Sequence, residues 1–139
     1  MQHKPYGYEL IIDMQDCVAV GLKQHFFGIT FVELLLRRLY LRGYFRSLCK
    51  AIRMKPQKRT YWDDMWCWPW NRQTKAHTTG TSAVQFIITS NITVHYLELA
   101  DSAYVNIFSC KPFSRERAVD TTKCWFKPGS CKTKLIERG

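Results

Sequence analysis

The sequence predicts an α+β fold, a two-layer sandwich in which helices cover one face of a mainly antiparallel sheet. The order of the elements carries this prediction, because the segments follow one another as strand, helix, three or four strands, helix and strand. The size of the chain agrees with it, since 139 residues with 46% hydrophobic content suit one domain around one core. No repeat or low-complexity linker interrupts the chain, so residues 1–139 are expected to form a single domain.

The first half of the chain predicts one strand and one long helix. Residues Tyr8 to Asp13 are rich in β-forming residues and are followed by polar ones, which predicts the first strand. Thr30 fits the N-cap of a helix, and Glu33 three residues later completes a capping box. The helix is expected to end before Lys55, because the proline that follows cannot continue it. Its apolar stripe is predicted at Phe31, Leu34, Leu35, Leu39, Leu41, Phe45, Leu48 and Ile52, with the basic residues Arg37, Arg38, Arg42, Arg46 and Lys50 elsewhere.

The middle of the chain predicts most of the sheet. Residues Arg59 to Trp62 are expected to form a strand, and residues 63–79 a loop whose tryptophans are partly buried. The apolar density of Ser82 to Thr89 suits a central strand with both faces covered or partly covered. Ile92 to Leu97 and Tyr104 to Ser109 are predicted to be two further strands joined by a polar turn.

The end of the chain predicts a second helix and a last strand. Ser114 can cap a helix that runs to about Trp125, and Glu116 lies near the positive end of that helix. The Pro-Gly pair that follows ends the helix, and Lys132 to Glu137 is expected to be a short strand.

The composition bears on the localisation of the protein and on the state of its cysteines. The sequence contains no secretory leader pattern and no apolar run long enough to span a bilayer, so we expect a cytoplasmic protein without a membrane partner. The six cysteines include no C-x-x-C pair, and neither they nor the histidines show metal-ligand spacing. We therefore expect free cysteines and no metal.

The chain is strongly basic, with a formal net charge of +10. A solvated basic face is the commoner explanation, because charge alone does not specify a partner, and we expect no nucleic acid. The alternative of a non-catalytic basic domain that binds nucleic acid remains open. It is supported by the tryptophans at 62, 66, 68 and 70, since bases stack on aromatic rings.

Four polar residues of the central strands stand at defined spacings. Relative to Ser90, Ser82 lies eight positions earlier, His95 five later and Cys110 twenty later. With this spacing the segment resembles the bacterial and archaeal S-adenosylmethionine decarboxylases, in which the serine that forms a pyruvoyl group has a serine, a histidine and a cysteine at these offsets. Four residues in matching strands are far more specific than any pair among them.

The resemblance implies that the chain cuts itself between Thr89 and Ser90. The Ser90 hydroxyl would attack the Thr89 carbonyl, and elimination followed by hydrolysis would leave a covalent pyruvoyl group at the new N-terminus. The products would be a β chain of residues 1–89 and an α chain of residues 90–139.

The resemblance also implies roles for two neighbours of Ser90. His95 would remove the Ser90 α-proton, for which a side chain with a near-neutral pKa is suited, and Ser82 would steer the intermediate. In one regular strand His95 would point away from Ser90, because five positions separate them. We therefore expect the chain to turn or bulge between Ser90 and His95.

For the mature enzyme, the resemblance implies a Schiff base between the pyruvoyl carbonyl and S-adenosylmethionine, loss of carbon dioxide, and return of a proton by Cys110. The product would supply aminopropyl groups for spermidine synthesis. The family also implies a homodimer of processed αβ protomers. Other interpretations remain open: a pyruvoyl decarboxylase of ornithine or arginine, and an uncleaved regulatory homologue.

Departures from the usual bacterial pattern bear on the substrate. Thr89 stands where that pattern has a glutamate, although only its carbonyl takes part in cleavage. Glu98 is the candidate for the acidic residue that contacts the ribose, one position closer to the histidine than usual. No aromatic residue directly precedes the Gly-x-Ser turn to stack on adenine, so Trp66, Trp68 or Trp70 would have to serve instead.

Overall fold

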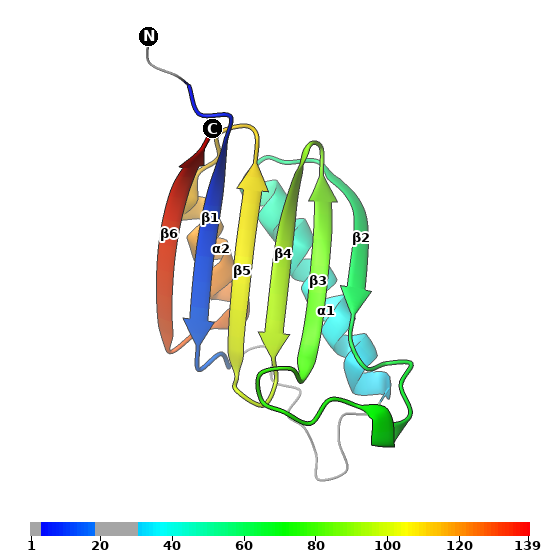
Figure 1. The fold of residues 1–139 in the computed structure, drawn as a ribbon. Helices are drawn as coiled ribbons and strands as arrows, with labels where there is room; N and C mark the ends of the chain where they lie inside the picture. Colours follow the sequence, from blue (N-terminus) through cyan, green and yellow to red (C-terminus); the bar gives the residue numbers. More distant parts are fainter. Residues whose placement is uncertain (1–3, 19–30) are drawn as a thin grey trace.

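The computed structural model describes residues 4–18 and 31–139, so the expected N-cap Thr30 lies outside the described residues. Within them the strands form one six-stranded sheet in the order β2-β3-β4-β5-β1-β6, and every neighbouring pair is antiparallel (Figure 1). The predicted α+β class is confirmed. In chain order the elements are β1 (Gly7–Gln15), α1 (Phe31–Ala51), β2 (Pro56–Trp62), the 3-10 turn η1 (Pro69–Asn71), β3 (Gly80–Ile87), β4 (Ser90–Leu97), β5 (Ser102–Ser109), α2 (Arg115–Phe126) and β6 (Ser130–Arg138).

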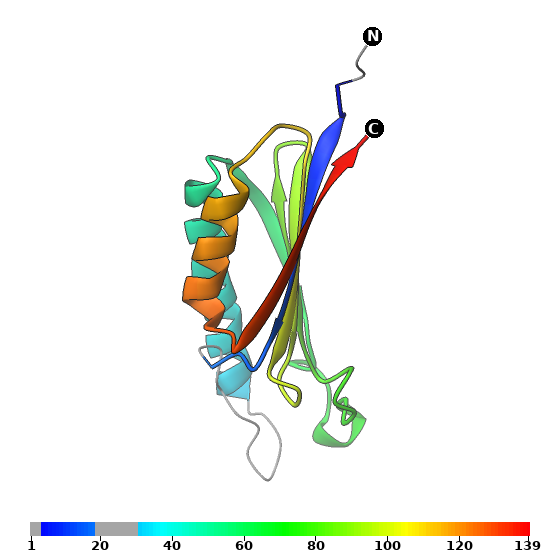
Figure 2. The same ribbon diagram turned by 90° about the vertical axis from the view of Figure 1, so that its left-hand side faces the viewer.

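The two helices cover one face of the sheet and leave the other open (Figure 2). Along β4, Ile92, Val94 and Tyr96 are buried in the core against the helices, while Thr93 and His95 alternate onto the uncovered side. We call this side the open face. The expectation that β3 has both faces covered or partly covered is confirmed on the helix side; on the open face Ser82 and Val84 are half-buried, whereas Phe86 is 46% exposed.

The predicted burial of α1 was wrong at several positions. Leu35 and Leu39 are exposed, whereas Arg37 is completely buried. Arg37 can be buried because it has partners inside the protein. Arg37 Nη2 donates to Glu98 Oε2 at 2.7 Å, and the Arg37 guanidinium lies 5.1 Å from the centre of the Tyr96 ring. An arginine that is paired in this way can occupy the inner face, which composition alone assigns to apolar residues. The buried residues of α1 are Leu34, Arg37, Leu41, Tyr44, Phe45, Leu48 and Cys49.

Helix α2 begins as predicted and packs closely on α1. Ser114 is its N-cap and accepts a hydrogen bond from the Arg117 backbone N–H at 3.2 Å. The Tyr44 hydroxyl lies 2.7 Å from Thr122 Oγ1 across the helix pair. A Cβ on Gly43 would come within 2.8 Å of the Trp125 ring, so this glycine allows the close approach.

All six cysteines are free thiols, in agreement with the sequence prediction. In the described part of the chain, no helix is long and apolar enough to cross a membrane.

Candidate active site

The hairpin of β3 and β4 joins two of the predicted site residues. Ser82 on β3 stands opposite His95 on β4, and its Oγ lies 2.8 Å from His95 Nδ1. Both side chains belong to the open face, because their neighbours Ala83 and Val94 are buried against the helices. The pair is therefore accessible to a ligand or partner on that face.

The register of the sheet places further groups in line with this pair. On β2, Trp62 is paired with Ser82. On the other side of the hairpin, Tyr104 of β5 is paired with His95, and Asp13 of β1 is paired with Tyr104. Sequence reasoning missed these three residues, because their proximity depends on strand register. Alternation within a strand would have placed each on a face, but not beside the others.

A cavity of about 460 Å³ opens beside Ser82 and His95. Its volume lies in the range of small-molecule sites. Two aromatic side chains contribute to its wall, Trp62 at 57% exposure and Tyr104 at 37%. Its other lining residues are Gln73, His77, Thr78, Gly80, Thr81, Tyr96 and Leu97. Trp66, Trp68 and Trp70, the expected stacking residues, do not line it.

The remaining predicted residues meet at the opposite end of the hairpin. Thr89 and Ser90 lie at the turn between β3 and β4, and Cys110 directly follows β5. Cys110 Sγ lies 2.8 Å from Thr89 Oγ1 and 4.0 Å from Ser90 Oγ. The Cys110 backbone N–H donates to Ser90 Oγ at 3.2 Å, which holds that hydroxyl in place.

These contacts change the acidity of the half-buried Cys110 thiol. The hydrogen bond between Cys110 Sγ and the Thr89 hydroxyl is the main cause that lowers the pKa of Cys110 below its ordinary value of 9.0. The Ser90 hydroxyl acts in the same direction, because both groups stabilise the thiolate.

The turn that carries the Thr89–Ser90 bond has an unfavourable backbone. Ile87 pairs with Ser90, so Ile88 and Thr89 form a two-residue loop. The turn types that suit such loops have a positive φ at the first loop residue, but here Thr89 in second place has φ 58° and Ile88 is not in the left-handed region. A β-branched residue in this region costs about 1–2 kcal/mol. The strain lies at the bond that the sequence predicts to be cut.

The expected bend between Ser90 and His95 was wrong. Strand β4 is regular, because its register with β3 is continuous from Ser90 to Leu97 and with β5 from Asn91 to Leu97. The turn comes before Ser90, at Ile88 and Thr89. Five residues of strand separate Ser90 from His95 by roughly 16 Å. One chain therefore holds two separate clusters, Ser82–His95 and Thr89–Ser90–Cys110.

The structure does not bring Glu98 to either cluster. Its carboxylate is buried beneath the sheet in the ion pair with Arg37, and its backbone N–H donates to the Thr79 carbonyl at 3.2 Å. The carboxylate nearest to the Ser82–His95 pair in register is Asp13, which lines a smaller cavity of about 260 Å³ together with His95 and Tyr104. Among the described residues, no group of three or more His, Cys, Asp or Glu side chains is placed to hold a metal ion.

Known proteins resemble this chain in sequence family and in fold. The family described as S-adenosylmethionine decarboxylase matches residues 8–139. Among solved structures, the adenosylmethionine decarboxylase from Aquifex aeolicus VF5 is similar, with a TM-score of 0.64 and 16% sequence identity, covering 99% of this chain and 93% of that one. At this identity the likeness concerns the fold. The comparison with curated proteins gave no match.

Proposed function

Because this chain belongs to the S-adenosylmethionine decarboxylase family, we propose that it cuts itself between Thr89 and Ser90 and that Ser90 becomes the pyruvoyl group of the active enzyme. The reaction is the decarboxylation of S-adenosylmethionine, which feeds polyamine synthesis. The observation that carries the proposal is the cluster of Thr89, Ser90 and Cys110 at a strained turn.

The residues at the turn fit self-cleavage. When the Ser90 hydroxyl attacks the Thr89 carbonyl, the peptide C–N bond breaks, a C–O ester bond forms, and the hydroxyl proton passes to the freed amine. Opening the turn releases the left-handed conformation of Thr89, so the backbone strain favours the acyl shift. The Cys110 N–H helps by keeping Ser90 Oγ oriented. Loss of the Ser90 α-proton then eliminates the ester, with the Thr89 carboxylate as the leaving group and dehydroalanine at residue 90. Hydrolysis of the imine tautomer of this residue releases ammonia and leaves the pyruvoyl group.

The residues around Ser90 also fit a pyruvoyl group in place of the serine. Such a group supplies a conjugated carbonyl that accepts electrons when carbon dioxide leaves the substrate. The Cys110 thiol lies within 4.0 Å of Ser90 Oγ, where it can return a proton to the substrate carbon. Since the Thr89 hydroxyl lowers the pKa of Cys110 in the uncut chain, the thiol is a stronger acid than an ordinary cysteine.

Two copies of the chain complete the site. Each copy carries the Ser82–His95 pair on the open face and the Ser90 cluster at the other end of the same hairpin, roughly 16 Å away, where Thr89 is exposed and Ser90 itself alternates with the buried Ile92 and Val94. A twofold axis between the clusters would therefore place each cluster of one copy against the other cluster of its partner. His95 of one protomer would remove the Ser90 α-proton of the other, while Ser82 holds the imidazole. The same packing would cover Phe86 and Tyr104, which are exposed on this face.

The cavity beside His95 suits the adenosyl part of the substrate. Trp62 offers an exposed indole face for the purine, and Asp13 lies near enough in register to meet a ribose hydroxyl or the sulfonium charge. Glu98 is less suited to the ribose, because its carboxylate is already paired with Arg37.

Replacing the stacking residue is expected to weaken substrate binding. Trp62→Ala should raise the KM for S-adenosylmethionine by about tenfold, since stacking of a base on an aromatic side chain is worth about 1–3 kcal/mol. Self-cleavage should be unchanged, because Trp62 does not contact the turn. Steady-state kinetics with the matched variant Trp66→Ala provides the control, because Trp66 does not line the cavity. An unchanged KM in Trp62→Ala would place the purine elsewhere.

The contact between Thr89 and Cys110 predicts a pH-dependent reactivity. In uncut Ser90→Ala protein, alkylation of Cys110 should rise with pH and reach its midpoint below 9.0, because the Thr89 hydroxyl stabilises the thiolate. Adding Thr89→Val removes that hydroxyl and should move the midpoint to higher pH. Peptide mass spectrometry follows Cys110 separately, with the exposed thiol of Cys124 as the reference for reagent reactivity. Equal midpoints would show that Thr89 does not act on Cys110.

A further inference from the structure

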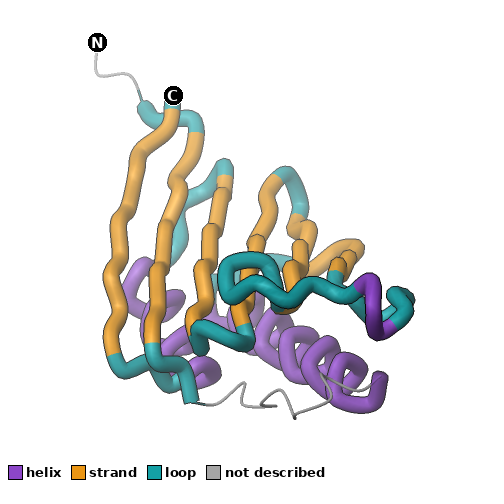
Figure 3. Tube along the Cα trace, turned by 60° about the horizontal axis from the view of Figure 1, so that its bottom comes forward, coloured by secondary structure: helices purple, strands orange, loops and turns teal. Residues whose placement is uncertain are grey.

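The start of α1 and the β2–β3 loop lie at the same end of the molecule (Figures 1 and 3), and both segments carry exposed apolar side chains. On the loop, Trp66, Trp68 and Trp70 are 80%, 67% and 77% exposed. On α1, Val32 and Leu36 are 61% and 48% exposed. The Phe31 and Trp66 rings connect the two segments, with their centres 5.7 Å apart. We call the whole set the tryptophan patch: Phe31, Val32, Leu35, Leu36, Leu39, Trp66, Trp68 and Trp70.

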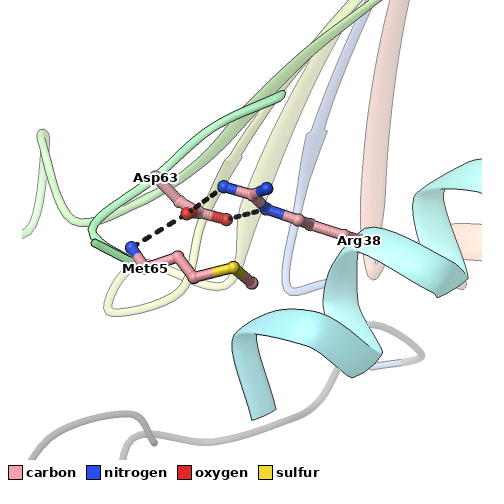
Figure 4. A network of polar contacts seen from close by, with 3 residues as sticks. All are labelled: Arg38, Asp63 and Met65. Carbon is pink, nitrogen blue, oxygen red and sulfur yellow. Dashed lines mark hydrogen bonds and ion pairs between the residues drawn. The ribbon is translucent and has the colours of Figure 1, made fainter. Parts of the chain in front are cut away.

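The loop is anchored, although its tryptophans face solvent. Asp63 accepts hydrogen bonds from Arg38 Nε at 2.9 Å, from Arg38 Nη2 at 2.7 Å and from the Met65 backbone N–H at 3.0 Å (Figure 4). Asp64 Oδ2 accepts from the Gln73 N–H at 2.8 Å and ties the two arms of the loop together. The outward position of the tryptophans is therefore built into the loop. The Phe31–Trp66 contact joins the loop to α1, and apolar side chains exposed in this number are typical of an interaction site.

Glu33 lies within the α1 part of the patch and is half-buried, whereas the exposed charges further along α1 and on the loop are basic. Both carboxylates of the loop, Asp63 and Asp64, are 7% exposed and are engaged in the hydrogen bonds that anchor it. The exposed charge left on the loop is Lys75. On α1, the outward surface that is apolar at Val32, Leu36 and Leu39 becomes basic over the following three turns, at Arg42, Arg46 and Lys50.

From this combination we propose that the tryptophan patch binds the surface of a membrane that contains anionic lipids. Indole rings and aliphatic side chains enter the boundary between headgroups and acyl chains, and neighbouring cations attract anionic headgroups. The sequence predicted no membrane partner because it lacks a spanning segment, but a surface that lies on the bilayer needs none.

Charge and chemistry favour lipid over other occupants. A nucleic acid would use the tryptophans and the cations, yet it would leave the aliphatic side chains of α1 without a partner. A second copy of the same patch would bring together the basic residues of both copies (Arg42, Arg46, Lys50 and Lys75), and their repulsion opposes such a contact. An anionic bilayer can take up the apolar side chains of the patch and attract these basic residues.

Vesicle binding tests the proposal with the full-length protein. The protein should sediment with vesicles that contain phosphatidylglycerol and remain in solution with vesicles of phosphatidylcholine alone. Binding should shift tryptophan emission to shorter wavelengths, and it should weaken when salt rises from about 0.1 M to about 1 M. The double variant Trp68→Ser/Trp70→Ser should bind anionic vesicles at least about tenfold less tightly, because two buried indoles are lost.

Matched variants separate the two contributions. Tyr6→Ser removes an aromatic residue that is 66% exposed directly before β1, a strand that begins at the other end of the molecule (Figure 1), and should leave vesicle binding unchanged. Arg46→Ala/Lys75→Ala should weaken binding and reduce its dependence on salt. Decarboxylase activity in solution should be normal in the Trp68→Ser/Trp70→Ser variant, because neither residue lines the cavity beside His95.

Several results would overturn the proposal. One is equal affinity for neutral and anionic vesicles, or no affinity for either. A second is undiminished binding by Trp68→Ser/Trp70→Ser. A third is a lower molar mass of that variant in light scattering, which would make the patch an interface between copies. The last is tight binding of a single-stranded oligonucleotide that the same variant loses.

Discussion

Ser90→Ala is expected to leave the protein as one uncut chain of 16.4 kDa, whereas the wild-type protein should give two fragments. The first fragment ends at Thr89 and the second begins at a pyruvoyl-blocked residue 90. The physical reason is that the hydroxyl oxygen is the nucleophile, and a methyl group in its place cannot attack the Thr89 carbonyl. Intact-protein mass spectrometry after purification distinguishes the two states directly.

A second serine serves as the control for this substitution. Ser102 at the start of β5 is also buried, and its hydroxyl donates to the Ala100 carbonyl at 3.0 Å, away from the cleavage turn. Ser102→Ala should still be cut. If the wild-type chain itself stays whole at 16.4 kDa, self-cleavage at this bond is refuted and the interpretation as an uncleaved homologue gains support.

Co-expression of two inactive variants is expected to restore cleavage in one of them only. Ser90→Ala lacks the nucleophile, and His95→Ala lacks the base that removes the Ser90 α-proton. In a mixed dimer, the intact Ser90 of the His95→Ala chain would face the intact His95 of the Ser90→Ala chain. The His95→Ala chain should therefore be converted to its two fragments, while the Ser90→Ala chain stays whole.

Different affinity tags allow the two chains to be followed separately by mass. The proposal depends on the roughly 16 Å between Ser90 and His95 along β4, a distance that an imidazole cannot bridge within one chain. Mixing two copies of the same variant provides the control, since no combination of identical defects rebuilds a site. If neither chain is cut in the mixed sample, the site does not form between protomers. The proposal for the tryptophan patch does not depend on that outcome.

The order and type of the elements were predictable because they depend on local chemistry. Ser114 caps α2 with a hydrogen bond that its own side chain supplies, and the helix ends shortly before Pro128, as expected. The alternation along β4 reflects one buried face, which is visible in the order of its residues. Strand ends were less predictable, since β2 and β6 extend further than expected through pairing with β3 and β1.

The spacing of Ser82, Ser90, His95 and Cys110 is a property of the chain alone, and through the resemblance to the family it predicts the chemistry of the site. The spacing does not show which of these residues lie together in space. A turn placed before Ser90 rather than after it pairs His95 with Ser82 and Cys110 with Ser90. That choice depends on the register between strands, which no single segment encodes.

What the sequence by itself determined is the α+β class, the two helices and the central hairpin, and it predicts which residues perform the reaction. Only the tertiary structure decided which of those residues meet. It buries Arg37 against Glu98, brings Trp62 to the cavity beside His95, and leaves the other loop tryptophans in solvent. The physical reason is that periodicity assigns a residue to a face, whereas neighbours on that face are set by strand register and helix packing.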